Sequence, residues 1–163
     1  MADSSLAAPA APRLDFEAAQ PAIYRAQLRL GQAAGDAFKA SGLPEGLFDL
    51  VQLRASQING CAFCLDMHSK DARHAGERED RLYLLSAWRE APHYTDVERA
   101  ALSLTEALTL VSIDQVPDEV WNAAANVLKE EQLAAVIGAV ITINGWNRIA
   151  IATRMTPGEY QPT

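Results

Sequence analysis

The chain contains only two cysteines, Cys61 and Cys64, and two residues separate them. His68 follows four residues after the second cysteine. Two thiols at this spacing can close into a disulfide and reopen, and the histidine is placed to move a proton at a thiol. A disulfide that closes so small a loop removes little entropy from the unfolded chain. The pair therefore indicates thiol redox chemistry rather than a structural cross-link.

Thiol redox chemistry requires a thiolate, so a reactive cysteine needs a pKa below its usual value of about 8.5. Three features of this segment favour a lowered pKa. The cysteines begin a predicted helix, where free backbone N–H groups and the helix dipole stabilise an anion. His68 lies on the same helical face as Cys64, at i+4. In addition, one thiolate of the pair can be stabilised by the S–H of the other.

The same three residues could instead bind zinc, because two thiolates, one imidazole and a water describe a catalytic zinc site. Structural zinc sites usually bring a second pair of ligands, however, and the chain has no further cysteine. His74 lies six residues beyond His68, almost on the opposite side of the helix, and His93 falls in a distant predicted loop. We therefore expect no metal site. A pair of inert buried thiols is the remaining alternative.

A proton acceptor is expected behind His68. Asp49 and Glu45 are the candidates, because they share one face of the preceding predicted helix. That helix ends in the turn before Cys61, so an antiparallel packing of the two helices would bring a carboxylate across from the cysteine helix. For Glu45, a solvated position is the simpler interpretation. Three polar residues could hold a water near the thiols or only form the turn: Ser56, Gln57 and Asn59.

Composition limits the classes of function. Of the 163 residues, 49% are hydrophobic and 21% are charged, which is ordinary for a soluble globular protein of one domain. The net charge of −7 argues against nucleic acid, whose phosphates attract clustered lysine and arginine. It is also unfavourable for anionic membranes. We expect neither nucleic acid nor a membrane as a partner.

The opening stretch, residues 1–12, has no basic start and no apolar core, so it does not resemble a secretory signal. The longest apolar run, residues 133–143, is about half of the ~20 residues that a membrane-spanning helix needs. We therefore expect a cytoplasmic protein. Structural disulfides are unusual in that compartment, which favours a catalytic or metal-binding cysteine pair.

The fold is predicted to be all-α, because apolar residues recur at helical spacing from Phe16 onward and no stretch alternates as a strand does. A disordered tail is expected over residues 1–13, followed by a single domain over residues 14–163 with about six to seven helices. Asn59-Gly60 predicts the turn before the cysteine helix, and Thr95-Asp96-Val97-Glu98 predicts a capping box. The predicted helices cover residues 23–40, 47–58, 61–75, 80–88, 95–110, 117–127 and 130–153.

The residues around the motif resemble a known family. The run over residues 50–68, which contains Asn59-Gly60-Cys61-Ala62-Phe63-Cys64 and His68, is similar to the alkylhydroperoxidase AhpD-like branch of the carboxymuconolactone decarboxylase family. The likeness covers most of the chain, from about residue 22 to residue 152. Three later segments share it: Leu85-Ser86-Ala87-Trp88-Arg89-Glu90, Glu98-Arg99-Ala100-Ala101-Leu102 and Ile143-Asn144-Gly145-Trp146-Asn147-Arg148.

The resemblance implies an AhpD-like helical fold that assembles into homotrimers or homohexamers and reduces hydroperoxides without a bound cofactor. By position, Cys64 matches the family's peroxidatic cysteine, Cys61 the resolving cysteine and His68 the proton-relay histidine. The family's relay glutamate falls twelve residues before Cys61, where this chain has Asp49. Because its side chain is one methylene shorter, the relay is expected to be longer or to use Glu45. Decarboxylase members of the family lack the cysteine pair, so decarboxylation is not expected.

These implied roles predict a reaction in two stages. Cys64 attacks the hydroperoxide to form a sulfenic acid, and Cys61 displaces water to form the disulfide. An external dithiol, on a lipoyl-bearing or a thioredoxin-like protein, then reduces the disulfide. Two other functions remain open. One is a non-catalytic redox-sensing or assembly module, and the other is a cofactor-free lyase or isomerase that uses His68 as a base.

Overall fold

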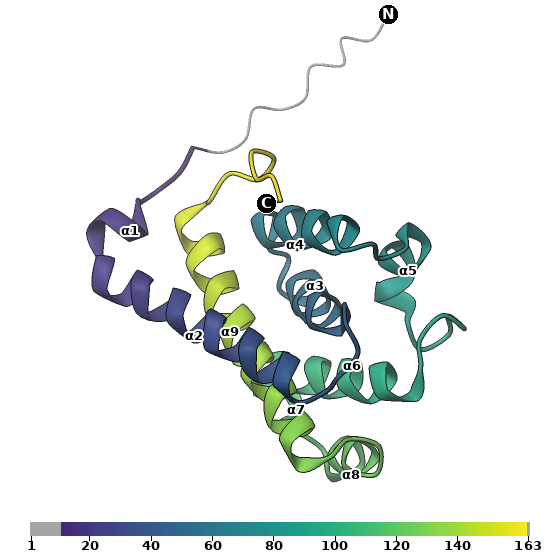
Figure 1. Cartoon of the computed structure of the whole chain (residues 1–163). Helices are drawn as coiled ribbons and strands as arrows, with labels where there is room; N and C mark the ends of the chain where they lie inside the picture. Colours follow the sequence, from purple (N-terminus) through teal and green to yellow (C-terminus); the bar gives the residue numbers. More distant parts are fainter. Residues whose placement is uncertain (1–10, 163) are drawn as a thin grey trace, which may run out of the picture.

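The computed structural model describes residues 11–162, which form nine α-helices and one short 3₁₀ helix, with no strand among them. The all-α fold predicted from the periodicity is therefore confirmed. Residues 1–10 of the predicted disordered tail lie outside the described residues. Figure 1 shows the helices arranged around one long helix, α9 (Glu130–Thr153).

The helix α9 is central because apolar residues occur all around it. It packs against α2 (Pro21–Ala40), α3 (Leu47–Asn59) and α6 (Asp96–Thr109). By length and composition alone, α9 could also cross a membrane. The whole helix is longer than the uninterrupted apolar run, residues 133–143, that the sequence analysis considered. Its burial against three other helices is the arrangement of a core helix, which passes the same test.

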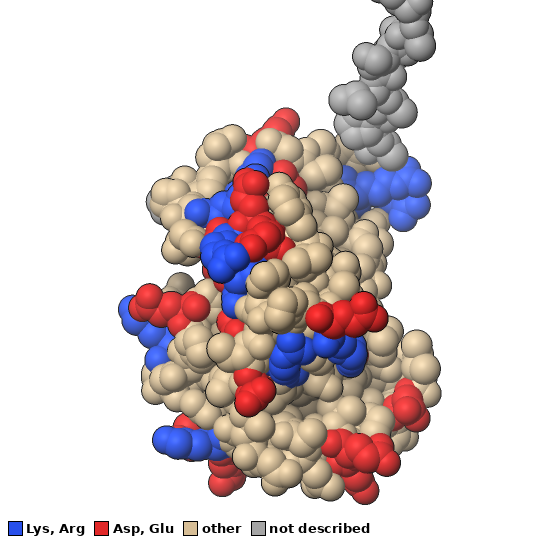
Figure 2. Space-filling view, turned by 90° about the vertical axis from the view of Figure 1, so that its right-hand side faces the viewer, with Lys and Arg blue, Asp and Glu red and all other residues tan. Residues whose placement is uncertain are grey.

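Charged side chains on the side of the molecule formed by α5 (Glu79–Leu84) and the start of α6 lie next to partners of opposite charge, as Figure 2 shows. Arg81 Nη2 is 2.5 Å from the carboxylate of Glu98, and Arg89 Nη1 is 2.5 Å from that of Glu106. These pairs connect α6 to the segment before it.

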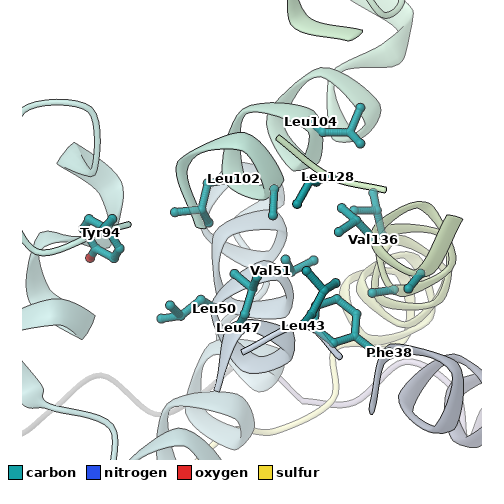
Figure 3. Packing of buried hydrophobic residues seen from close by; sticks show 14 of the residues in the cluster. Phe38, Leu43, Leu47, Leu50, Val51, Tyr94, Leu102, Leu104, Leu128 and Val136 are labelled. Atoms are coloured by element: carbon teal, nitrogen blue, oxygen red, sulfur yellow. The ribbon is translucent and has the colours of Figure 1, made fainter. Parts of the chain in front are cut away.

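The main hydrophobic core lies where α3, α6 and α9 meet. Leu50 and Val51 of α3, Leu102 and Leu104 of α6, and Val136 of α9 are completely buried. Figure 3 shows their side chains converging between the helices. Full burial of each such side chain contributes about 1.5–3 kcal/mol. This core fixes α3, the helix that ends at the turn before the cysteines.

The predicted turn and the predicted helix starts are present. Gly60 ends α3 in the left-handed conformation (φ 67°), and α4 (Ala62–His74) follows with Cys61 as its N-cap. At the start of α6, the Glu98 N–H donates to Thr95 Oγ1 at 3.3 Å and the Thr95 N–H donates to the Glu98 carboxylate at 2.7 Å. The capping box is therefore confirmed.

The short elements differ most from the prediction. The helix predicted over residues 80–88 divides into α5 and a 3₁₀ turn, Leu85–Ala87. Two single-turn helices were not predicted, because four residues are too few to show a periodicity. The elements not yet named are α1 (Phe16–Ala19), α7 (Val111–Asp114) and α8 (Asp118–Ala125).

A second, smaller hydrophobic cluster surrounds the two cysteines. Cys61 and Cys64 pack against Ala55 of α3 and against Ile143 and Ala150 of α9. The thiols therefore lie where three helices meet, and both are buried. Partly buried side chains close this cluster: Phe63, Trp146 and Met155.

Candidate active site

The turn between α3 and α4 places both cysteines. The left-handed Gly60, a conformation that strains residues with a Cβ, reverses the chain, and the Cys61 N–H donates to the Ser56 carbonyl at 3.0 Å. Cys61 then occupies the N-cap of α4, where its Sγ accepts a hydrogen bond from the Cys64 N–H, with N and S 3.4 Å apart. The local sequence is therefore sufficient to set the pair at a helix start, as predicted.

The pKa values of the two thiols are shifted in opposite directions, because a hydrogen bond joins the two groups. The pKa of Cys61 is lowered to about 7, chiefly by the hydrogen bond from the Cys64 thiol, while burial opposes the shift and backbone N–H groups and Asn147 support it. The pKa of Cys64 is raised, because its S–H is held in that hydrogen bond and because it is buried. These directions, together with the hydrogen bond from the Cys64 N–H to Cys61 Sγ, favour the thiolate on Cys61. A lowered thiol pKa was expected here, but its position on Cys61 was not.

Asn147 of α9 connects Cys61 to a buried polar network. Its side-chain amide donates to Ser56 Oγ at 3.0 Å, and its carbonyl oxygen accepts a hydrogen bond from Asn59 at 2.8 Å. Asn59 also donates to Asn144 at 3.0 Å. These bonds hold the Asn147 amide beside the sulfurs. Sequence reasoning did not identify Asn147, although two asparagines within the apolar stretch of α9 were a signal of a buried polar contact.

His68 is buried on α4, one helical turn beyond Cys64. Within residues 11–162 its imidazole makes no direct hydrogen bond to either sulfur. Burial lowers the pKa of His68 to about 4, and the negative charge of Asp71 opposes this shift only in part. The imidazole is therefore neutral at neutral pH and able to accept a proton, which the predicted relay requires.

The two predicted carboxylates occupy different environments. Glu45 is exposed, as expected for a solvated acid. Asp49 is partly buried, and burial together with the charges of Asp71 and Glu77 raises its pKa to about 6. Among the described residues, however, the only carboxylate within 4.0 Å of the His68 ring nitrogens is that of Asp71, whose Oδ2 is 3.8 Å from Nδ1. The relay role of Asp49 stays a prediction, and Asp71 is a neighbour that its i+3 spacing could have revealed.

An apolar cavity of about 290 Å³ opens beside Cys64. Tyr24 and Leu28 of α2 form one wall, and Phe63 of α4 and Trp146 of α9 form others. The rings of Tyr24 and Trp146 meet edge to face, with their centroids 5.2 Å apart. Cys64 lines this cavity and Cys61 does not, although Asn147 contacts both thiols. An apolar molecule in the cavity would therefore meet the sulfur of Cys64 first.

Zinc was weighed as an alternative use of the cysteines. In the part of the chain that the structure describes, no three His, Cys, Asp or Glu side chains come together as a potential metal site. His74 is exposed at the end of α4, and His93 lies in the loop before α6. Among the described residues, Cys61, Cys64 and His68 therefore do not form a three-ligand cluster.

Comparison with known proteins agrees with this description. The model of the carboxymuconolactone decarboxylase family matches residues 21–107. The uncharacterized protein YdfG of Bacillus subtilis is 45% identical over 114 residues, which are 70% of this chain and 78% of YdfG.

Solved structures share the fold. The chain resembles ATU0492 of Agrobacterium tumefaciens, described as a protein of unknown function and a putative antioxidant defence protein AhpD. The identity is 36%, the TM-score is 0.80, and the match covers 94% of this chain and 99% of that one. A cysteine-to-alanine variant of the debrominase Bmp8, in complex with 2,3,4-tribromopyrrole, matches at 18% identity and a TM-score of 0.75 over 87% of this chain and 74% of that one. At this identity the second likeness shows the fold alone.

Proposed function

Since this chain belongs to the carboxymuconolactone decarboxylase family, has the AhpD-like fold and carries a buried Cys-x-x-Cys pair, we propose that it is a thiol-dependent hydroperoxide reductase. The observation that supports this most strongly is that the two sulfurs lie in different environments. Cys61 Sγ accepts the Cys64 N–H and the pKa of Cys61 is lowered, whereas Cys64 lines an apolar cavity. An organic hydroperoxide presents an apolar body and an electrophilic oxygen, and this arrangement suits both.

In the proposed first step, the proton of Cys64 moves to the neutral imidazole of His68 or across the shared hydrogen bond to Cys61. The Cys64 thiolate then attacks the terminal peroxide oxygen, and the O–O bond breaks. The alkoxide that leaves takes this proton back, from the imidazolium or from the Cys61 thiol, and departs as an alcohol. The sulfur is oxidised to a sulfenic acid, and the peroxide is reduced by the same two electrons.

In the second step, Cys61 attacks the sulfur of the Cys64 sulfenic acid. The S–O bond breaks, the hydroxide takes up a proton and leaves as water, and the Cys61–Cys64 disulfide forms. An external dithiol, on a lipoyl-bearing or thioredoxin-like protein, returns the pair to the reduced state by thiol–disulfide exchange. We propose that this cycle takes place in the cytoplasm, in a homotrimer or homohexamer, and that it needs no bound cofactor.

The proposal is tested by stopped-flow oxidation of the reduced protein with cumene hydroperoxide. We expect a rate roughly 100-fold or more above that of free cysteine, because a positioned base alone contributes about 10²–10⁴-fold. Cys64→Ser should abolish the reaction, and Cys61→Ser should accumulate a sulfenic acid on Cys64 that a dimedone probe captures. The oxidation rate of His68→Gln is compared with that of the control His74→Gln, which changes an exposed histidine of the same helix.

A rate no faster than that of free cysteine would remove the proposed activity and leave a redox-sensing module. If Cys64→Ser reacts with peroxide on Cys61 while Cys61→Ser does not react at all, the two roles are reversed. A lyase or isomerase that uses His68 as a base would instead keep its activity in Cys64→Ser.

A further inference from the structure

The chain after α9 turns back across α4, as Figure 1 shows for the C-terminal segment. Asp66 of α4 accepts the Gly158 N–H at 2.9 Å. Lys70, one turn further along α4, donates to the carbonyl oxygens of Gly158 and Tyr160 at 3.2 and 2.9 Å. The ammonium of Lys70 also lies 3.0 Å from Asp66. The segment is thus attached to the helix that carries Cys64 and His68.

This attachment places Tyr160 against a neighbour of His68. The Tyr160 hydroxyl donates to Asp71 Oδ1 at 2.6 Å, and the other carboxylate oxygen of Asp71 faces His68 Nδ1 at 3.8 Å. The two oxygens of one carboxylate therefore serve two different partners. The hydrogen bond to Asp71 raises the pKa of Tyr160 to about 12, so the phenol remains a donor throughout the physiological range.

We propose that Asp71, held by the Tyr160 hydroxyl, is the carboxylate that orients His68 in this chain, so that the imidazole carries its proton on Nδ1 and leaves Nε2 free as the base. Asp71 and Tyr160 are positioning residues, since they act through His68. The inference rests on the proposed function for its kinetic part, whereas the tautomer of His68 is independent of peroxide chemistry.

The charge of the site favours Asp71 over Asp49. A carboxylate 3.8 Å from Nδ1 is too far for a direct hydrogen bond but close enough to stabilise an imidazolium directly or through one water. Asp71 raises the pKa of His68, whereas the charge of Asp49 acts on the pKa of Tyr160. The titratable groups around this end of α4 are Asp49 on α3, Asp71, Glu77 beyond the helix and Tyr160 on the C-terminal segment.

The oriented imidazole has a definite task in the proposed step. When Cys64 loses its proton, Nε2 gains one and the ring becomes an imidazolium. Asp71 then faces a positive charge across a short distance, and the ion pair lowers the free energy of that state. Because the Tyr160 hydroxyl occupies one Asp71 oxygen, the other oxygen stays directed at His68 instead of turning to solvent.

The experiment combines the ¹⁵N NMR spectrum of the imidazoles with oxidation kinetics. In protein labelled at its three histidines, His68→Gln assigns the His68 signals, and the shifts of Nδ1 and Nε2 report the tautomer at pH 7. We expect the Nδ1–H tautomer to predominate. Asp71→Asn should shift the population toward Nε2–H and slow the oxidation of Cys64 by cumene hydroperoxide about tenfold.

The role of Tyr160 is tested by a double-mutant cycle. Tyr160→Phe removes only the hydroxyl, and we expect a smaller loss of rate, about threefold, that disappears in the Asp71→Asn background. Tyr83→Phe is the matched control, because Tyr83 is exposed and donates to Glu79 on the surface. Lys70→Gln loosens the C-terminal segment without removing the hydroxyl. A loss in Tyr160→Phe that persists in Asp71→Asn and is reproduced by Lys70→Gln would mean that Tyr160 only anchors the segment.

The outcomes separate this inference from the proposed function. If Asp49→Asn changes the His68 tautomer and Asp71→Asn does not, Asp49 is the partner and the inference is overturned. If Asp71→Asn changes the tautomer in a wild-type background that reacts with peroxide no faster than free cysteine, the orientation stands and the proposed activity falls.

Discussion

Two groups of charged side chains, both attached to α3, differ in how completely their charges are satisfied. In the first group, the Glu106 carboxylate accepts hydrogen bonds from Arg54, Trp88 and Arg89 at 2.7, 2.8 and 2.5 Å. Burial acts to raise the pKa of Glu106, but these hydrogen bonds outweigh it and the pKa is lowered. The ionised carboxylate is thus more stable in the folded protein than in the unfolded chain.

The second group, around His68, has the opposite balance. The Asp49 side chain makes no hydrogen bond or ion pair with any residue in the range 11–162, and burial raises its pKa to about 6. His68 resists protonation for the same reason, with a pKa of about 4. Buried charges without complete partners destabilise a fold, and they are typical of sites where protons must move. The contrast favours a structural role for the Glu106 group and supports the proton-transfer role that we propose for His68.

The largest effect is expected from breaking the satisfied group. Glu106→Gln keeps the volume of the side chain but leaves Arg54, which is only 16% exposed, without its counter-charge. We expect the free energy of unfolding to fall by about 3 kcal/mol at pH 7, with the oxidation rate of Cys64 unchanged. Urea unfolding of Glu106→Gln, with the exposed Glu90→Gln as control, measures this loss. A loss no greater than that of the control would place Glu106 among ordinary surface pairs.

The next largest effect on stability is expected for His68, and this effect on stability appears only in acid. Because its pKa is lower in the folded protein than the ordinary value of 6.5, stability is lost as the pH falls from 6.5 through about 4. His68→Gln should remove about 2 kcal/mol of this loss between pH 7 and pH 4.5. Unfolding curves at the two pH values, compared with those of His74→Gln, test the difference. Equal pH dependence in the wild type and in His68→Gln would contradict a neutral buried imidazole.

Asp49→Asn should stabilise the protein, in contrast to Glu106→Gln. The pKa of Asp49 is raised from 3.8 to about 6, so its ionisation costs stability as the pH rises through that interval. At pH 7 the substitution should increase the free energy of unfolding by about 1 kcal/mol, less than the roughly 3 kcal/mol of the full shift because Asp49 is only partly buried and water screens its charge; below pH 3.8 it should have no effect. Thermal unfolding across this range measures the gain. A destabilised Asp49→Asn at pH 7 would show that the carboxylate has partners after all.

Asn147→Ala should have the smallest effect, on the thiol itself. The amide is one of several donors that lower the pKa of Cys61, after the Cys64 thiol and a backbone N–H. Its loss should raise the pKa by about half a unit. The pH dependence of alkylation by iodoacetamide measures this pKa, and Asn122→Ala at an exposed position of α8 is the control. An unchanged midpoint would assign Asn147 to packing alone.

Local sequence signals predicted the parts of the site that depend on neighbouring residues. Asn59-Gly60 predicted the turn, because an asparagine–glycine pair favours the left-handed backbone that Gly60 adopts. The cysteine spacing predicted a pair at a helix start, and the i+4 position predicted His68 on the same helix. The capping box at Thr95 and the bounds of α9 were also predicted from local sequence signals. Each of these features is decided within one or two helical turns.

Contacts between distant segments were not predictable in this way. Asn147 and Tyr160 reach the site from segments more than 80 residues beyond the cysteines, and nothing in their own neighbourhood reveals which sulfur or carboxylate they meet. Asp71 was not predicted although it is local, because the proton acceptor was expected on the preceding helix, at Asp49. The choice between the two acids depends on how α3 and α4 pack, which spacing alone does not determine.

The sequence by itself determined that this protein is all-α and that it carries a Cys-x-x-Cys pair with a histidine one turn away. Helical periodicity and turn chemistry act over a few residues, so they can be read directly from the chain. Only the tertiary structure decided that hydrogen bonds lower the pKa of Cys61 while Cys64 lines the apolar cavity. It also decided that Asp71 is the acid nearest to His68. Burial and electrostatic interactions depend on the packing of α2, α3, α4 and α9, and that packing exists only in the folded molecule.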